Sequence, residues 1–204
     1  MSSPRRRAVL VHGMGRTPVS MLLLAARLRR RGLDCEVFGY FAGADSFDGI
    51  AARLSERLAR QPAGYVAVGH SLGGLLLREA ISRLPDAAPR PAHLFLLGTP
   101  NHASHLAKRL RHSPLYRLLT GDSGQLLADD GRVEAIRVLD VPITVVAGIA
   151  GPRHPKGPFG HEPNDGVVAL SEARLEGAAL HPLPALHTFL MNSARVADLI
   201  ASIG

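Results

Sequence analysis

The chain has 204 residues, of which 46% are hydrophobic and 20% are charged. This composition allows one substantial core and excludes a disordered or fibrous protein, so we expect a single domain over residues 1–204. The formal net charge of +7 leaves nucleic acid and an anionic lipid surface as partners to weigh.

The positive charge does not indicate a nucleic-acid-binding protein. It is spread along predicted helices, nearly all of it is arginine, and only three tyrosines and no tryptophan are available to stack on bases. We interpret the charge as solvated helix faces and predict no nucleic-acid partner. Peripheral contact with an anionic lipid surface stays open.

The chain contains no apolar run close to the roughly 18 residues that a membrane span needs. The arginines before "AVLV" resemble the start of a secretory signal, but His12 and Gly13 interrupt the apolar run, so we predict a strand there. The lone Cys35 excludes an intrachain disulfide and fits a reducing compartment. We therefore expect a cytoplasmic protein.

Apolar runs of strand length alternate with helical patterns in chain order. The runs predict strands at 8–11, 35–38, 65–68, 94–97, 143–147 and 178–183, and helices at 18–31, 47–60, 72–84 and 188–202. This alternation predicts an α/β fold with a doubly wound, mostly parallel six-stranded sheet and helices on both faces. Ligands of such sheets bind beyond the carboxyl ends of the strands.

Two segments interrupt the alternation. Residues 99–140 are too long for a simple crossover and contain "LAKRLRHSPLYRLL", which predicts a helical, lid-like insertion. We expect the insertion to place its leucines toward one side, where they either pack on the core or cover the site: Leu106, Leu110, Leu115, Leu118 and Leu119. The second segment is a Gly/Pro-rich loop at 148–168.

The stretch "GHSLGG" at 69–74 carries the clearest chemical signal. Gly69, Ser71 and Gly73 form G-x-S-x-G between a predicted strand and a predicted helix, the pattern of a nucleophile elbow. The start of the following helix would point its free amides at an oxyanion. The alternative is that Ser71 is only a helix N-cap.

A serine nucleophile needs a base, and the base needs an orienting acid. Asp165 lies in "PNDGVV" after the fifth strand, and His187 lies in "LPALHTFL" after the sixth. The chain order Ser, Asp, His matches the hydrolase template. The alternatives are a turn residue for Asp165, a helix-start residue for His187, and His181, inside the sixth strand, as the base.

The oxyanion hole has candidates in two loops. If the strand order is 2-1-3-4-5-6, the loops after the first and third strands meet at the topological switch point. The backbone N–H groups of Met14, in "HGMG", and Leu72 would then be the paired donors. A simple turn is the alternative for "HGMG". We interpret His12 and His70 as packing or orienting residues.

The strings "VLVHGMG", "GHSLGG", "LLGTPNHAS" and "NDGVV", followed by a late histidine, resemble the α/β-hydrolase superfamily, specifically its lipase and serine-esterase branch. The resemblance covers nearly the whole chain. It implies a triad of Ser71, Asp165 and His187 and an oxyanion amide at Met14. With seven residues before its first strand, the chain resembles the compact six-stranded form of the fold.

These observations predict a serine hydrolase that cleaves carboxylic esters, with a small-molecule ester or lipid as substrate and no cofactor. The chain has no H-E-x-x-H and no paired-ligand spacing, so we predict no metal. We interpret "GDSG" at 121–124 as a loop. The alternatives are an acyltransferase or thioesterase acting on carrier-bound acyl groups, and a catalytically inactive binding protein of the same fold.

Overall fold

The computed structural model of the chain describes residues 6–203 and is built around one six-stranded sheet. Its strand order is β2-β1-β3-β4-β5-β6, and all neighbouring strands are parallel. The strands are β1 (Arg7–Val11), β2 (Asp34–Phe38), β3 (Val66–His70), β4 (His93–Leu97), β5 (Ile143–Gly148) and β6 (Ala179–Leu183). The predicted six-stranded α/β fold is confirmed, and the order is the one on which the oxyanion prediction depends.

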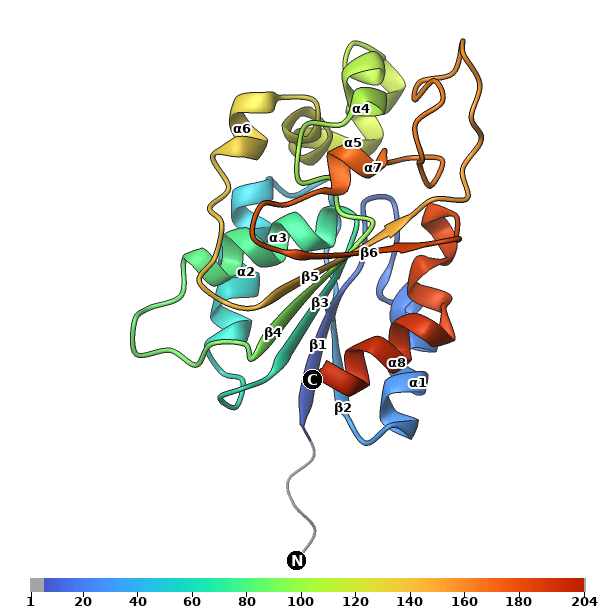
Figure 1. Cartoon of the computed structure of the whole chain (residues 1–204). Helices are drawn as coiled ribbons and strands as arrows, with labels where there is room; N and C mark the ends of the chain where they lie inside the picture. Colours follow the sequence, from blue (N-terminus) through green and yellow to red (C-terminus); the bar gives the residue numbers. More distant parts are fainter. Residues whose placement is uncertain (1–5, 204) are drawn as a thin grey trace, which may run out of the picture.

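Helices cover both faces of the sheet and its carboxyl end (Figure 1). The helices, with the 3₁₀ turns η1 and η2, are η1 (Pro18–Met21), α1 (Leu22–Arg30), α2 (Phe47–Leu58), α3 (Leu72–Ser82), α4 (His105–Leu110), α5 (Pro114–Leu127), α6 (Asp130–Glu134), α7 (Leu170–Ala173), η2 (His187–Asn192) and α8 (Ala194–Ile203). In Figure 1, α1 and α8 lie on one face and α2 and α3 on the other. None of the helices in this part of the chain has both the length and the apolar character that crossing a bilayer requires.

The alternation of side chains along each strand divides the core into two clusters. Ala8 and Leu10 of β1 pack in the cluster that includes α1 and α8, while Val9 and Val11 pack with α2 and α3. Since both faces of the inner strands are covered, β1, β3, β4 and β5 are almost entirely buried. The edge strand β6 is more exposed, and the site lies beyond the strands rather than within this core.

Two predicted helices differ in detail from the structure. The first begins as a 3₁₀ turn with Pro18 at its start before α1 continues as an α-helix. The last is divided into η2 and α8 because Ser193 has an extended backbone, with ψ of 131°. The break lets η2 hold His187 near the sheet while α8 runs back along it.

The insertion after β4 is helical, as predicted, but its leucines do not share one side. Leu115, Leu118 and Leu119 are 64%, 76% and 61% exposed, whereas Leu106 and Leu110 line a cavity beside Ser71. The expectation of one common face is therefore wrong. The chain turns between the end of α4 and Pro114, so the helical register is not continuous across the two leucine groups.

The "GDSG" stretch is a second correction, because it lies inside α5 rather than in a loop. The helix bends at Gly121, whose φ of 55° and ψ of −144° form a backbone conformation that residues with a side chain rarely adopt. After the bend, the Asp122 carboxylate accepts a hydrogen bond from the Phe47 N–H (3.0 Å) and pairs with Arg132 (2.8 Å). These contacts hold the second half of α5 against the start of α2.

Candidate active site

Ser71 lies on a sharp turn between β3 and α3. It has φ of 54° and ψ of −126° and is the only non-glycine residue with positive φ in the described part of the chain. Its side chain makes no capping hydrogen bond to α3, so the N-cap interpretation has no support. Its hydroxyl thus lies at the carboxyl end of the sheet without a bond to α3.

The glycines around Ser71 are required by close backbone approach. A Cβ on Gly69 would lie 2.5 Å from the backbone of Gly74, and one on Gly73 would lie 2.4 Å from the carbonyl oxygen of Val11. Neither neighbour is a flexible side chain, so neither can yield. The G-x-S-x-G pattern thus follows from packing the start of α3 directly against β3 and the end of β1.

Asp165 and His187 form a buried hydrogen-bonded pair. The Nδ1–H of His187 donates to Asp165 Oδ2 at 2.7 Å, and the two side chains come from loops after neighbouring strands. Asp165 Oδ1 accepts from the N–H groups of Val167 (2.9 Å) and Val168 (2.7 Å), and the His187 N–H donates to the Asp165 carbonyl (2.9 Å). The carboxylate is therefore fixed on both oxygens, which fixes the imidazole in turn.

His187, not His181, is the histidine at this place. His181 lies in the exposed edge strand β6, paired in register with Val146. His187 is 8% exposed and packs against the ring of His70, with centroids 4.7 Å apart. His70 is buried, and its Nε2–H donates to the His187 carbonyl oxygen at 3.0 Å.

Burial favours the neutral form of two histidines near Ser71, His70 and His12. Burial lowers the pKa of His70 to about 3, and it also lowers the pKa of His12. His12 stacks on Tyr40 with centroids 4.3 Å apart and donates from Nδ1 to the Gly13 carbonyl at 2.9 Å. Both residues thus occupy packing positions, one under each loop beside Ser71.

The loop after β1 contacts the elbow, as the strand order requires. A Cβ on Gly13 would lie 3.0 Å from Ser71 Cβ, so the two turns are in direct contact. Within residues 6–203, neither the Met14 N–H nor the Leu72 N–H donates a hydrogen bond to another group. These are two unpartnered amide donors beside the serine, the arrangement that an oxyanion hole needs.

Ser71 and His187 are not hydrogen-bonded to each other among the residues described. Such contacts are often long without substrate and tighten when it binds. Beside Ser71 is a small, largely apolar cavity of about 80 Å³. Its walls come from the Met14 loop, the insertion and the segment after Asp165; they include Leu106, Ala107, Leu110, Tyr116, Leu127, Val167 and Val168.

Some positioning contacts could not be inferred from the sequence. Glu172 is 3% exposed, and its carboxylate accepts from the N–H groups of Ala169 (2.7 Å) and His105, which joins the Asp165 loop to the start of α4. Desolvation raises the pKa of Glu172. Its only sequence signal is a glutamate three residues after a helix start, which is half of a capping box.

A second such contact joins the loops that carry Met14 and His187. Arg16 donates from Nη2 to Thr188 Oγ1 at 2.8 Å. The two residues are 172 positions apart, so no local pattern indicates the bond. No group of three or more His, Cys, Asp or Glu side chains suited to a metal ion is found within residues 6–203.

No protein-family model matches this chain, and no curated protein matches it either. Several solved structures, however, are similar to it in fold. A Bacillus licheniformis lipase, BlEst2 in its mature form, superposes with a TM-score of 0.74 and 19% identity, over 98% of this chain and 91% of that one. A metagenomic carboxyl esterase superposes with a TM-score of 0.71 and 22% identity, over 99% of this chain and 75% of that one.

A thioesterase domain from the curacin biosynthetic pathway is also similar, with a TM-score of 0.63 and 16% identity over 98% of this chain and 92% of that one. These identities are low, while the superposed share of each chain is high. The likeness therefore concerns the arrangement of strands, helices and connecting loops. The chain thus has the α/β-hydrolase fold.

Proposed function

We propose that the protein is a serine hydrolase that cleaves carboxylic esters through an acyl-enzyme intermediate. The observation that supports this most is the 2.7 Å contact between Asp165 and His187, buried beside the residue that precedes Ser71. An acid, a base and a serine at the carboxyl ends of three strands are the groups that acyl transfer needs. The esterases and lipases among the similar structures agree with this chemistry.

In the proposed mechanism, the Ser71 hydroxyl attacks the ester carbonyl carbon while His187 Nε2 takes its proton. Asp165 holds the Nδ1–H and stabilises the imidazolium that forms. The N–H groups of Met14 and Leu72 bind the oxyanion of the tetrahedral intermediate. The imidazolium then protonates the leaving alcohol. In the second step the imidazole takes a proton from water as the water oxygen attacks the acyl carbon, and the imidazolium returns that proton to the Ser71 oxygen as the acid leaves.

The insertion at 99–140 provides one wall of the acyl pocket in this proposal. Leu106 and Leu110 of this insertion line the cavity beside Ser71 together with Val167 and Val168. A cavity of about 80 Å³ is too small to enclose a long acyl chain, since roughly 150 Å³ is needed to enclose even a benzene molecule. We therefore expect short acyl chains to be the preferred substrates.

The direct test is labelling with a fluorophosphonate, which phosphonylates an activated serine. We expect wild type to be labelled and Ser71→Ala to be neither labelled nor active, with turnover of p-nitrophenyl acetate falling about 10⁴-fold or more. Ser123→Ala is the control, because Ser123 follows a glycine and one further residue as Ser71 does, but it is fully buried in α5 and its hydroxyl has no partner among residues 6–203. Labelling of Ser71→Ala would refute the proposal.

A thioester is the second substrate class to compare, because a thioesterase domain is among the similar structures. The same residues would act on either bond, so the comparison separates substrates rather than mechanisms. We expect kcat/KM for p-nitrophenyl acetate to exceed that for an acetyl thioester of equal acyl length. The reverse order would favour a carrier-bound acyl group as the substrate.

A further inference from the structure

Exposed apolar side chains are concentrated at one end of the molecule. The described residues include thirteen large hydrophobic side chains that are exposed. All except Val138 and Ile203 lie in the loops, the insertion or the first helical turns that directly follow the carboxyl end of a strand. Scattered single exposures are ordinary, but this one-sided distribution is not.

The insertion provides the largest part of this surface. Leu115, Leu118 and Leu119 lie at helical spacing on the side of α5 that faces away from the core. Phe41, which is 67% exposed, adjoins them, because a Cβ on Gly43 would lie 3.2 Å from both its ring and the Leu119 carbonyl oxygen. We call the surface formed by these four residues and the basic residues around them the carboxyl-end face.

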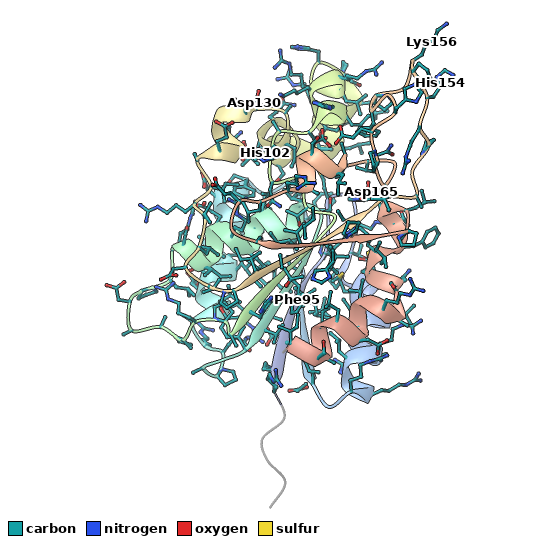
Figure 2. The ribbon with its side chains drawn as sticks, viewed as in Figure 1. Phe95, His102, Asp130, His154, Lys156 and Asp165 are labelled. Atoms are coloured by element: carbon teal, nitrogen blue, oxygen red, sulfur yellow. The ribbon has the colours of Figure 1, made fainter. Side chains whose placement is uncertain are left out.

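Several arginines near these side chains have no acidic partner within the described range, although Lys108 of the insertion pairs with Asp130. No Asp or Glu occurs between residues 87 and 121, and Arg109, Arg111 and Arg117 are exposed and form no ion pair with any residue that the structure describes. A second basic segment, 149–161, also has no acidic residue. Its loop carries His154 and Lys156 to the same end of the molecule as the insertion (Figure 2).

We propose that the carboxyl-end face binds an anionic lipid surface. Leucine and phenylalanine flanked by arginine and lysine match such a surface, because the apolar side chains enter the acyl boundary while the cations contact the headgroups. A second copy of the chain is a poor occupant, since it would bring the same positively charged arginines of the two insertions close together. Leu110 is 39% exposed and also lines the cavity, so bound lipid would lie at the cavity mouth.

The test is co-sedimentation of the full chain with phosphatidylcholine vesicles, with and without phosphatidylserine. We expect binding to the anionic vesicles to be at least about tenfold stronger and to weaken at high salt. Arg111→Gln and Arg117→Gln should each lower the partition coefficient about fivefold. The double variant Leu115→Ser/Leu118→Ser should lower it about tenfold or more, because the apolar contact is lost.

The control variants change residues of the same kinds, exposed apolar and exposed basic, at the opposite end of the sheet. Val138→Ser and Arg60→Gln alter one exposed apolar and one exposed basic residue there, and both should bind as wild type does. Ser71→Ala should also bind fully, which separates this inference from the proposed catalysis. Equal binding to neutral vesicles, equal losses in the control variants, or no vesicle binding together with dimerisation through the leucines would overturn it.

Discussion

Ser71 combines an unfavourable backbone conformation with a partly exposed side chain that does not cap its helix. Its φ of 54° and ψ of −126° lie in a region that only glycine adopts readily. A non-glycine residue held there lowers the stability of the fold by about 1–3 kcal/mol. The surrounding turn maintains this conformation because the Ser71 N–H donates to the Leu97 carbonyl (2.9 Å) and the Gly74 N–H to the Ser71 carbonyl (3.0 Å). The strain presents the hydroxyl away from the sheet.

We therefore predict that Ser71→Gly is more stable than Ser71→Ala, although both are inactive. Glycine relieves the strain, while its greater freedom in the unfolded chain offsets part of the gain, which leaves about 1 kcal/mol in the free energy of unfolding. Urea denaturation of the two variants measures the difference. Equal stabilities would mean that the strain is no larger than the entropic cost of glycine.

At the scale of elements, the insertion sets the size of the cavity beside Ser71. Leu106 of α4 lines that cavity together with Tyr116 of α5, while Leu118 faces away from the core. We predict that Leu106→Ala shifts the preference toward longer acyl chains. Each CH₂ that gains burial contributes about 0.8 kcal/mol, which is roughly fourfold in kcat/KM.

The measurement is kcat/KM for p-nitrophenyl esters from acetate to octanoate. The ratio of hexanoate to acetate turnover should rise in Leu106→Ala and stay at the wild-type value in Leu118→Ala. Parallel losses on every ester in Leu106→Ala would instead mean that this leucine supports the fold of α4 and does not limit acyl length.

The elements that the sequence predicts well are those whose pattern is local. Each inner strand is a short apolar run buried on both faces, and α2 and α3 have regular apolar spacing, so their positions follow from neighbouring residues. The prediction of one leucine face on the insertion is wrong because the spacing of the leucines does not reveal the turn after α4. The leucines recur at helical spacing through the sequence, but the chain forms two separate helices there.

In the candidate site, too, some residues have a signal in the sequence and others do not. Ser71 has a local signal, and the positions of Asp165 and His187 after their strands follow from chain order, so all three could be proposed from the sequence. Met14 required the strand order as well. Glu172 and the bond between Arg16 and Thr188 depend on loops brought together by the whole sheet, and no local pattern encodes such contacts.

At the scale of the whole molecule, buried histidines couple stability to pH. Burial lowers the pKa of His70 to about 3, whereas histidine in an unfolded chain has a pKa of about 6.5. Below about 6.5 the unfolded chain therefore binds a proton that the folded protein does not, so stability falls as pH falls. The loss continues until about pH 3, where folded His70 also protonates.

We predict that His70 alone lowers the free energy of unfolding by about 2 kcal/mol between pH 7 and pH 5. Urea denaturation at the two pH values should give a drop that is smaller by about this amount in His70→Gln than in wild type. His154→Gln, which alters an exposed loop histidine, should leave the drop unchanged. An unchanged drop in His70→Gln would contradict the assignment.

Both ends of the insertion meet at one buried side chain, Arg78 of α3. Its guanidinium donates to Asn101 Oδ1 (3.0 Å), near where the insertion begins, and to the Ile136 carbonyl (2.6 Å), near where it ends. The insertion thus begins and ends at nearly the same point, before the chain returns to the start of β5. Between such anchors, descendants of this gene can lengthen, shorten or exchange the helices without moving a strand, so substrate range can diverge while the framework is inherited unchanged.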